Sequence, residues 1–218
     1  MIQILGIPVN ILHALVVELH TGIAVFAFLA LLAMLITDLI VWKKPASERV
    51  QIIRRDTDAI AYFGALGAVF FLILSGITGY LIEPYSTMIS DPLLLNKSLT
   101  ALGALYFWAM FAFIRFWCGP GMWRKTGLYA LNFIAAVIAL LFTTFAGSMG
   151  AELSPYGQSA LNFVYNALGL NFRSITLTQN DVYITAAVTI VFIAIIGLLS
   201  LMNRNPTTKG KVAAVTKH

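Results

Sequence analysis

Long apolar stretches alternate with short polar connections along most of the chain. The apolar stretches are residues 9–42, 58–82, 98–118, 127–148 and 182–202. Each holds the roughly 20 mostly apolar residues that an α-helix needs to cross the hydrocarbon core of a bilayer. We therefore predict an all-α integral membrane protein in which residues 1–203 form a single bundle of five transmembrane helices.

The connection after the fourth stretch has a pattern of its own. Ser154 and Pro155 are typical of a helix start, and Gly169 is typical of a helix stop. The apolar residues between them fall on one helical face: Tyr156, Ala160, Phe163, Val164, Ala167 and Leu168. This pattern predicts a short helix that lies on the outer membrane surface.

Basic residues gather on one side of the five-span arrangement. Of the 14 lysines and arginines, all but Lys97 and Arg173 lie in or beside the connections after the first and third stretches, or in residues 204–218. Because Lys and Arg are enriched in cytoplasmic loops, we predict that the N-terminus lies outside and the C-terminus inside. Residues 204–218 then form a basic cytoplasmic tail, which we expect to be disordered and suited to the anionic inner surface.

Composition narrows the class of protein further. The chain is 60% hydrophobic and 11% charged, which is more apolar surface than a soluble core uses. The net charge of +5 follows from the asymmetry of the connections, so we expect a lipid bilayer as partner and no nucleic acid. The single cysteine, Cys118, excludes an internal disulfide and a CxxC metal site.

Two of the three histidines lie in the first apolar stretch. His13 and His20 are seven residues apart, so they share one helical face and are separated by about 10 Å along the axis. The same stripe continues through small residues to Asp38, which we expect to pair with Arg54 or Arg55 near the inner end.

The predicted depth of the histidines follows from the topology. If the hydrocarbon begins on the inner side near Trp42, a span of about 20 residues ends near Gly22. His20 then lies at the outer edge of the apolar layer, and His13 lies about 10 Å further out. The apolar segment around His13 would need cover from the outer loops, from another membrane subunit, or from a second copy of the chain.

The histidines allow three readings. In the first, His20, or less directly His13, is an axial ligand of haem b. Two histidines on one helix face approach an iron from the same side, so the sixth ligand is Met149, Met88 or a histidine of a second copy, or is absent. In the second reading, His20 or His13 binds copper with help from a carboxylate such as Glu152. In the third, the histidines bond to loop carbonyls or to a partner subunit and hold no cofactor.

Several enzyme signatures are absent from the sequence, namely GxxxxGK[ST], GxSxG, HExxH and GxGxxG. We assign no catalytic residue. The leading hypothesis is a haem b-binding electron-transfer protein, or such a subunit of an oxidoreductase complex. The alternative is a non-catalytic accessory subunit of a larger respiratory or oxidase-type membrane complex, and the third is a copper-site membrane protein.

Three short motifs carry a resemblance: LHALVVELH (Leu12 to His20), ITGYLIE (Ile77 to Glu83) and GSMGAEL (Gly147 to Leu153). They resemble a family of small prokaryotic four-helix membrane proteins thought to bind haem b. That family has a His-Pro…His-Phe-Pro motif in its first helix, a Thr-Gly pair late in its second, and a Gly-Gly-Glu-Leu-like turn after its fourth.

The resemblance covers about residues 10–160 and leaves the last predicted helix as an addition. It implies a helical bundle in a prokaryotic plasma membrane, with a haem b site at the outer end of the first helix. The family's prolines beside the histidines are absent here. Asn96-Lys97 and Tyr156-Gly157 stand where the family has further histidines.

Overall fold

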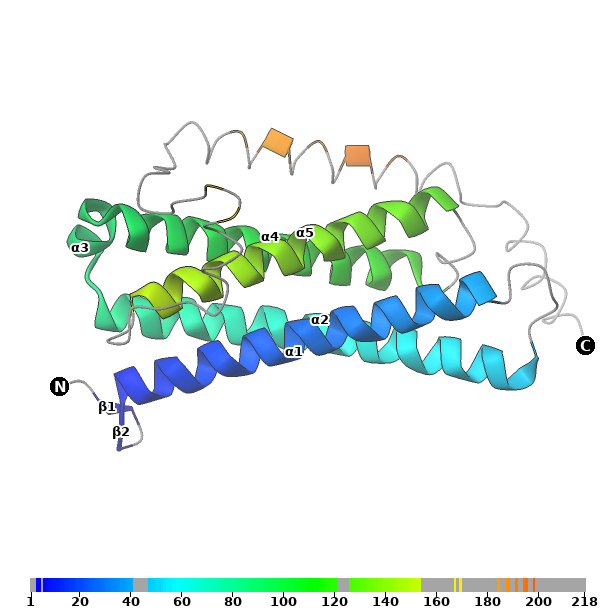
Figure 1. Cartoon of the computed structure of the whole chain (residues 1–218), viewed down its shortest axis with the longest axis horizontal. Coiled ribbons are helices and arrows are strands. Elements are labelled where there is room, and N and C mark those ends of the chain that lie inside the picture. Colours follow the sequence, from blue (N-terminus) through cyan, green and yellow to red (C-terminus); the bar gives the residue numbers. More distant parts are fainter. Residues whose placement is uncertain are drawn as a thin grey trace, which may run out of the picture.

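The fold is a bundle of long helices that run roughly along the long axis of the molecule, each antiparallel to the next (Figure 1). The computed structural model describes residues 3–4, 6–40, 47–120 and 126–153, with isolated positions between 167 and 198. In this part of the chain, four helices are long and apolar enough to cross a membrane. They are α1 (Val9–Ile40), α2 (Glu48–Ile82), α4 (Pro92–Cys118) and α5 (Thr126–Glu152).

Three short elements accompany the long helices. The strands β1 (Gln3–Ile4) and β2 (Ile7–Pro8) pair as an antiparallel hairpin, and Gly6 between them has the positive φ of 78° that favours glycine. The helix α3 (Tyr85–Ser90) joins α2 to α4. Asp91 then caps α4, since its carboxylate accepts a hydrogen bond from the backbone N–H of Leu93 at 2.8 Å.

The all-α prediction and the first four predicted stretches are confirmed, but two helices start earlier than predicted. α2 begins at Glu48 rather than at residue 58, and α4 begins at Pro92 rather than at residue 98. The first turns of these two helices are polar, so a pattern of apolar residues does not include them. The fifth stretch, the surface helix and residues 204–218 lie outside the described residues, apart from the isolated positions.

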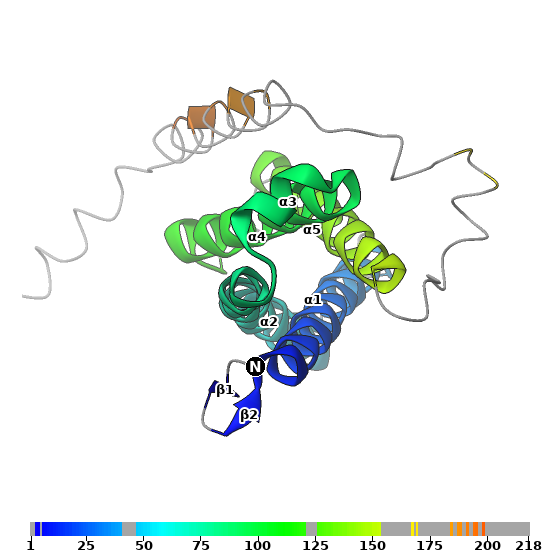
Figure 2. The same ribbon diagram turned by 90° about the vertical axis from the view of Figure 1, so that its left-hand side faces the viewer.

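The helices pack in sequence order around a common core. α1 packs against α2 and α4 against α5, while α2 also contacts α4 and α1 also contacts α5. An end-on view shows the four long helices around one centre (Figure 2). We call the end with Val9, Ile82, Pro92 and Glu152 the histidine end, and the end with Ile40, Glu48, Cys118 and Thr126 the arginine end.

Small residues bring α1 and α2 close together. A Cβ atom placed on Gly64 would lie 2.8 Å from the Cβ of Ala27, and one on Gly67 would lie 3.2 Å from a methyl carbon of Ile23. Glycines at such positions let two membrane helices approach closely. A Cβ atom placed on Gly76 of the same helix would meet no heavy atom within 4 Å, so close packing is confined to part of α2.

Ion pairs hold the arginine end together. Arg54 of α2 lies 3.1 Å from the Asp38 carboxylate of α1, so the predicted partner of Asp38 is confirmed. Arg115 of α4 binds both carboxylate oxygens of Asp58 on α2, and its guanidinium carbon lies 5.6 Å from the centre of the Tyr62 ring. Buried charges in a membrane bundle are normally paired in this way.

The predicted inward stripe of α1 is the buried one. His20, Ala24, Ala27, Leu31 and Met34 are all buried, and they follow the stripe that begins at His13. On the opposite pair of helices, Trp108 of α4 donates a hydrogen bond from its indole N–H to the Thr143 hydroxyl of α5 at 3.1 Å. The core is therefore formed by all four long helices.

Candidate functional site

The positions of the histidines along the bundle follow from the constant register between α1 and α2. Facing pairs along the two antiparallel helices are His13–Gly79, Ile23–Gly67, Ala27–Gly64 and Asp38–Arg54. By this register His20 lies level with Leu72. The nearest α2 charges, Asp58 and Glu83, are about 21 Å and about 16 Å from that level along the helix.

His20 therefore lies beside the apolar part of α2, between its charged residues, and its position at the outer edge of the membrane stays a prediction. The prediction took the apolar layer to begin at Trp42. Asp38 instead pairs with Arg54 in the charged first part of α2, so the last turns of α1 lie beside charged residues. This end of α1 is therefore less apolar in its surroundings than its own sequence indicates.

The His20 ring is buried, and its hydrogen bond to Val16 favours one tautomer. The side chain is only 4% exposed, and Nδ1 lies 3.3 Å from the carbonyl oxygen of Val16. A carbonyl oxygen only accepts, so in the neutral ring Nδ1 carries the proton and Nε2 carries the lone pair. The hydroxyl of Thr21 lies 3.4 Å from Nε2, but it donates its proton to the Val17 carbonyl at 2.9 Å.

His13 is tied to the neighbouring helix instead of to its own. Its Nδ1 lies 2.9 Å from the Thr78 hydroxyl. That hydroxyl donates back to the carbonyls of Leu74 at 2.9 Å and Ser75 at 3.2 Å, so it accepts from His13. Gly79 leaves room for the ring, because a Cβ there would lie 3.3 Å from His13 Cε1. His13 thus links α1 to α2 at the histidine end.

Lys97 of α4 brings a positive charge to the same region. It interacts electrostatically with both histidine rings and with Glu83, which ends α2. Its side chain lies against α5, where a Cβ on Gly150 would be 3.4 Å from Lys97 Cε. Sequence reasoning did not assign Lys97 or Thr78 a role, although Lys97 is one of two basic residues predicted on the outer side.

The two halves of the bundle differ in chemistry. The half toward the histidine end buries polar side chains from all four long helices, namely His20, Thr78, Asn96, Thr100, Thr143 and Ser148. The half toward the arginine end buries mostly apolar side chains, both small and large, including Ala27, Ala61, Leu31, Met34, Trp108 and Phe111, and its buried polar residues are Asp58 and Asn132. The half toward the histidine end, which we call the polar half, therefore offers more buried hydrogen-bonding groups.

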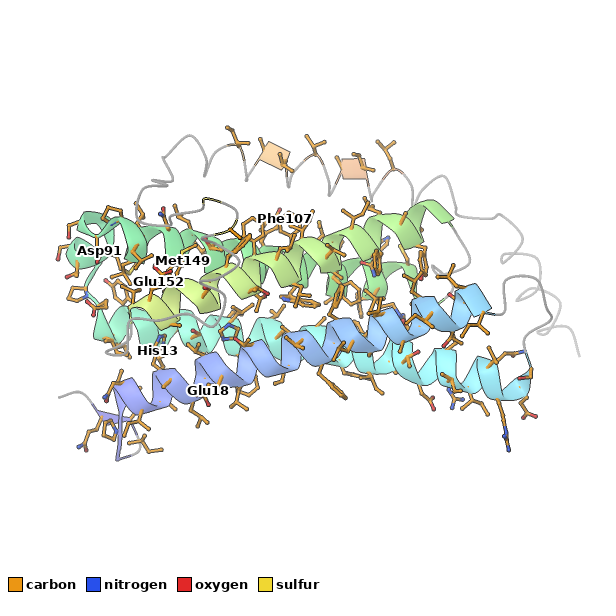
Figure 3. All side chains as sticks on the ribbon, in the orientation of Figure 1. His13, Glu18, Asp91, Phe107, Met149 and Glu152 are labelled. Atoms are coloured by element: carbon orange, nitrogen blue, oxygen red, sulfur yellow. The ribbon has the colours of Figure 1, made fainter. Side chains whose placement is uncertain are left out.

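The other predicted ligands lie at the histidine end, as Figure 3 shows for Met149 and Glu152. Met149 is buried in a small apolar cluster with Leu93, against which Phe145 and Leu153 pack. Glu152 is half-buried at the end of α5, and no hydrogen bond or ion pair joins it to His13 or His20 among the described residues. The structure therefore brings neither residue into contact with a histidine nitrogen.

A metal site of the usual kind is not assembled in the described part of the chain. No group of three or more His, Cys, Asp and Glu side chains that could hold a metal ion occurs there. Copper in proteins is typically held by several such ligands.

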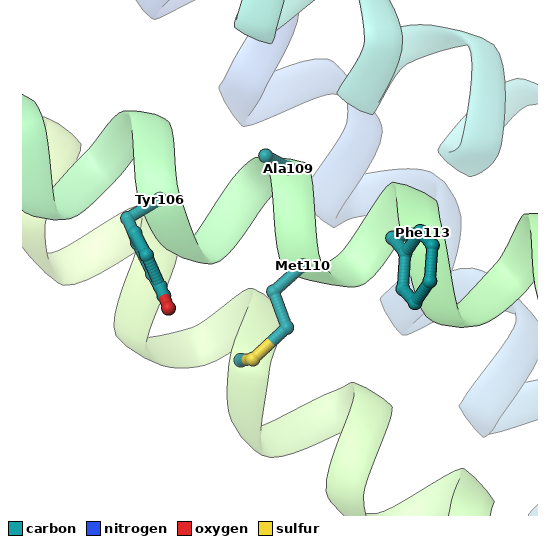
Figure 4. A pocket seen from close by; sticks show the side chains of 4 residues that line it. All are labelled: Tyr106, Ala109, Met110 and Phe113. Atoms are coloured by element: carbon teal, nitrogen blue, oxygen red, sulfur yellow. The ribbon is translucent and has the colours of Figure 1, made fainter. Parts of the chain in front are cut away.

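An apolar groove lies on α4 (Figure 4). It has a volume of about 180 Å³ and is lined by Tyr106, Ala109, Met110 and Phe113. Ligand pockets usually enclose roughly 300–1,000 Å³ and include several placed polar groups. The groove is smaller than this and has the Tyr106 hydroxyl as its one side-chain oxygen or nitrogen, so we place the candidate site at the buried histidines.

No family model, curated protein or solved structure matches the chain.

Proposed function

We propose that this chain is a membrane-embedded electron-transfer protein, or such a subunit of a larger complex, that binds haem b through Nε2 of His20. The observation that carries the proposal is the state of this one imidazole. It is buried in the bundle, its Nδ1 proton is directed to the Val16 carbonyl, and no hydroxyl or N–H group donates to its Nε2 lone pair among the described residues. Histidines that bind metals commonly donate their second ring nitrogen to a backbone carbonyl in this way.

His20 would supply one imidazole nitrogen to the iron of a haem. Val16 orients the ring, and the Thr21 hydroxyl does not donate a hydrogen bond to Nε2, because its proton goes to the Val17 carbonyl. Burial in the polar half of the bundle keeps bulk water from the ring, which tunes the potential of a bound haem. The haem itself supplies one-electron chemistry. Met149 would be a poor second ligand, because its side chain packs against Leu93.

The proposed topology has five spans, with the N-terminus outside, in the plasma membrane of a prokaryote. With four spans alone, the chain before Val9 and the chain after Glu152 would lie on the same side of the membrane, because Val9 and Glu152 are both at the histidine end. The basic residues after Glu152 are concentrated beyond residue 203, and the positive-inside rule favours placing them with the basic connection after α1. A fifth span over residues 182–202 would return the chain to the other side of the membrane and place these basic residues with the connection after α1. The histidine end then faces outside.

The test is a reduced-minus-oxidised optical spectrum of the purified protein, together with its haem content. The proposal predicts a b-type α-band and about one haem per chain, because one imidazole is set up to bind. The His20→Ala variant should lose both. Glu18→Gln is the matched control, since Glu18 is exposed on the same helix. A protein that is folded and binds no haem would overturn the proposal.

The alternative is an accessory subunit of a larger membrane complex. In this alternative, an apolar extension of α1 above the membrane would be covered by a partner subunit. Exposed apolar side chains are present in that segment at Ile11, Leu15 and Leu19. With His13 level with Gly79, most of this segment lies beside the apolar part of α2, so lipid can cover it. Gentle solubilisation distinguishes the two: a defined larger complex without haem favours the alternative, whereas a haem-containing monomer excludes it. A copper-site protein has the least support.

A further inference from the structure

Glu18 places a carboxyl group on the outward face of α1. Its side chain is exposed and lies on the side of the helix away from α4 and α5 (Figure 3). By the register of α1 on α2, it lies level with Ile73, about 15 Å from Glu83 and about 22 Å from Asp58 along the helix. No hydrogen bond or ion pair joins Glu18 to another side chain in the described part of the chain.

The residues that share this face with Glu18 repeat with the spacing of a coiled coil. They are separated alternately by four and three positions, and they are Ile11, Leu15, Glu18, Gly22, Val25, Leu29, Leu32, Ile36 and Leu39. All are exposed except Leu32, which is half-buried. A seven-residue repeat with two apolar positions is the pattern by which two helices pack along a common seam, and pairs of membrane helices also use this geometry. We call these residues the α1 seam.

Lipid alone does not satisfy the α1 seam. It can cover the apolar side chains, but it offers the Glu18 carboxyl group no hydrogen bond, and a polar group buried in this way is unfavourable. Ionisable residues within membrane helices therefore usually face other protein groups. If this part of α1 instead stood above the membrane, Leu15 and Val25 would belong to an exposed apolar stripe that needs cover. A protein partner on the α1 seam meets both conditions.

A second copy of the chain fits the α1 seam by symmetry. Two copies in one membrane have the same orientation, so their α1 seams meet in parallel and each residue faces its own counterpart. Glu18 then faces the partner's Glu18. A carboxyl group that carries its proton both donates and accepts, so the two can hydrogen-bond to each other, whereas a different protein would need a donor at this one level. Four residues on, a Cβ placed on Gly22 meets no heavy atom within 4 Å, so the two backbones can approach closely there.

We propose that two copies of the chain pack together through the α1 seam in a parallel, left-handed pair of helices, with the two Glu18 carboxyl groups hydrogen-bonded across the interface. The heptad spacing sets the left-handed crossing. Glu18 is the one ionisable residue of the seam, and it fixes the register of the pair as a single polar core residue does in coiled coils. The interface does not depend on haem binding.

Disulfide crosslinking of the full-length protein in native membranes tests the interface. In a Cys118→Ser background, Leu15→Cys, Gly22→Cys and Leu29→Cys should each give a covalent dimer under mild oxidation, because facing residues of a parallel pair lie within disulfide reach. Phe70→Cys is the matched control, since Phe70 is exposed on α2 at nearly the level of Gly22. Dimer yields at the seam positions no higher than in this control would overturn the interface.

Variants of Glu18 test the hydrogen bond within the pair. Glu18→Leu should raise the dissociation constant of the dimer in lipid vesicles by about 3–30-fold, as expected for the loss of an interhelical hydrogen bond. Glu18→Gln should keep the wild-type value, because an amide also donates and accepts. Energy transfer between differently labelled copies measures the constant. An unchanged constant in Glu18→Leu would overturn the role of Glu18, and a monomeric wild type would overturn the interface; neither result would alter the test of haem binding at His20.

Discussion

Arg115 and Asp58 form a two-point ion pair between α4 and α2. Arg115 Nε donates to Asp58 Oδ1 at 2.7 Å, and Nη2 donates to Oδ2. The two side chains are 13% and 5% exposed, so both charges are largely withdrawn from solvent. Such a pair adds geometric specificity, because both oxygens of the carboxylate face both donors. It sets how α2 and α4 meet at the arginine end.

Replacing Arg115 alone should therefore destabilise the bundle. Arg115→Met leaves the Asp58 carboxylate without its guanidinium, and breaking a buried pair from one side costs about 3–5 kcal/mol. The Asp58→Leu, Arg115→Met double variant should recover most of that loss. The free energy of unfolding in detergent measures both effects. Arg55→Gln removes an exposed pair with Asp56 and is the control. An Arg115→Met variant as stable as this control would contradict the account.

The contact between Gly64 and Ala27 predicts a difference between two glycines of one helix. Gly64→Ala should destabilise the protein by about 1–3 kcal/mol, because the new Cβ would sit 2.8 Å from Ala27 Cβ and α1 must shift. Gly76→Ala meets open space and should be neutral or stabilising, since Ala is a better helix former. Thermal unfolding of the two variants checks this. Equal effects would show that α1 and α2 do not touch at Gly64.

Much of the fold was accessible from the sequence because apolar length and charge asymmetry are strong signals in membrane proteins. The first four apolar stretches and the inward stripe of α1 were predicted correctly. The Asp38–Arg54 pair was also foreseen, since a carboxylate and an arginine near one membrane face have few other partners. The polar first turns of α2 and α4 were missed, because they contribute no apolar signal.

The site was harder to predict because it depends on contacts between helices. Periodicity placed His13 and His20 on one face, but their depth required the register of α1 on α2, which only packing reveals. The acceptor for His13 is Thr78, 65 residues away, and the charge near both rings comes from Lys97 on a third helix. No local pattern in the sequence predicts contacts between residues that lie so far apart in the chain.

Thr78 distinguishes the roles of the two histidines. Thr78→Val removes the acceptor of His13 and should lower the unfolding free energy by about 0.6–1.7 kcal/mol, as interhelical hydrogen bonds in membranes do. Haem affinity should change little, because His20 is held by Val16. Thr78→Ser should behave like wild type. Titration with haem checks the second part; a loss of about 10–100-fold in affinity would make His13 the ligand instead.

The five-span topology predicts which side of the membrane each end of the chain occupies. A reporter fused after His218 should be active and protected inside intact cells, because the basic residues beyond position 203 favour the cytoplasmic side. A reporter inserted between Glu83 and Asp91 should be accessible from outside. Labelling of intact and opened cells measures both. Exposure of the C-terminal reporter to the outside would contradict a fifth span.

The central claim, that Nε2 of His20 is an axial ligand, is tested most directly by replacing the side chain and returning the imidazole. His20→Gly should lose the b-type α-band of the reduced protein, and added free imidazole should restore it by occupying the space of the missing ring. His13→Gly should keep the band without added imidazole. A His20→Gly variant that retains the wild-type spectrum and haem content in the absence of imidazole would contradict the account.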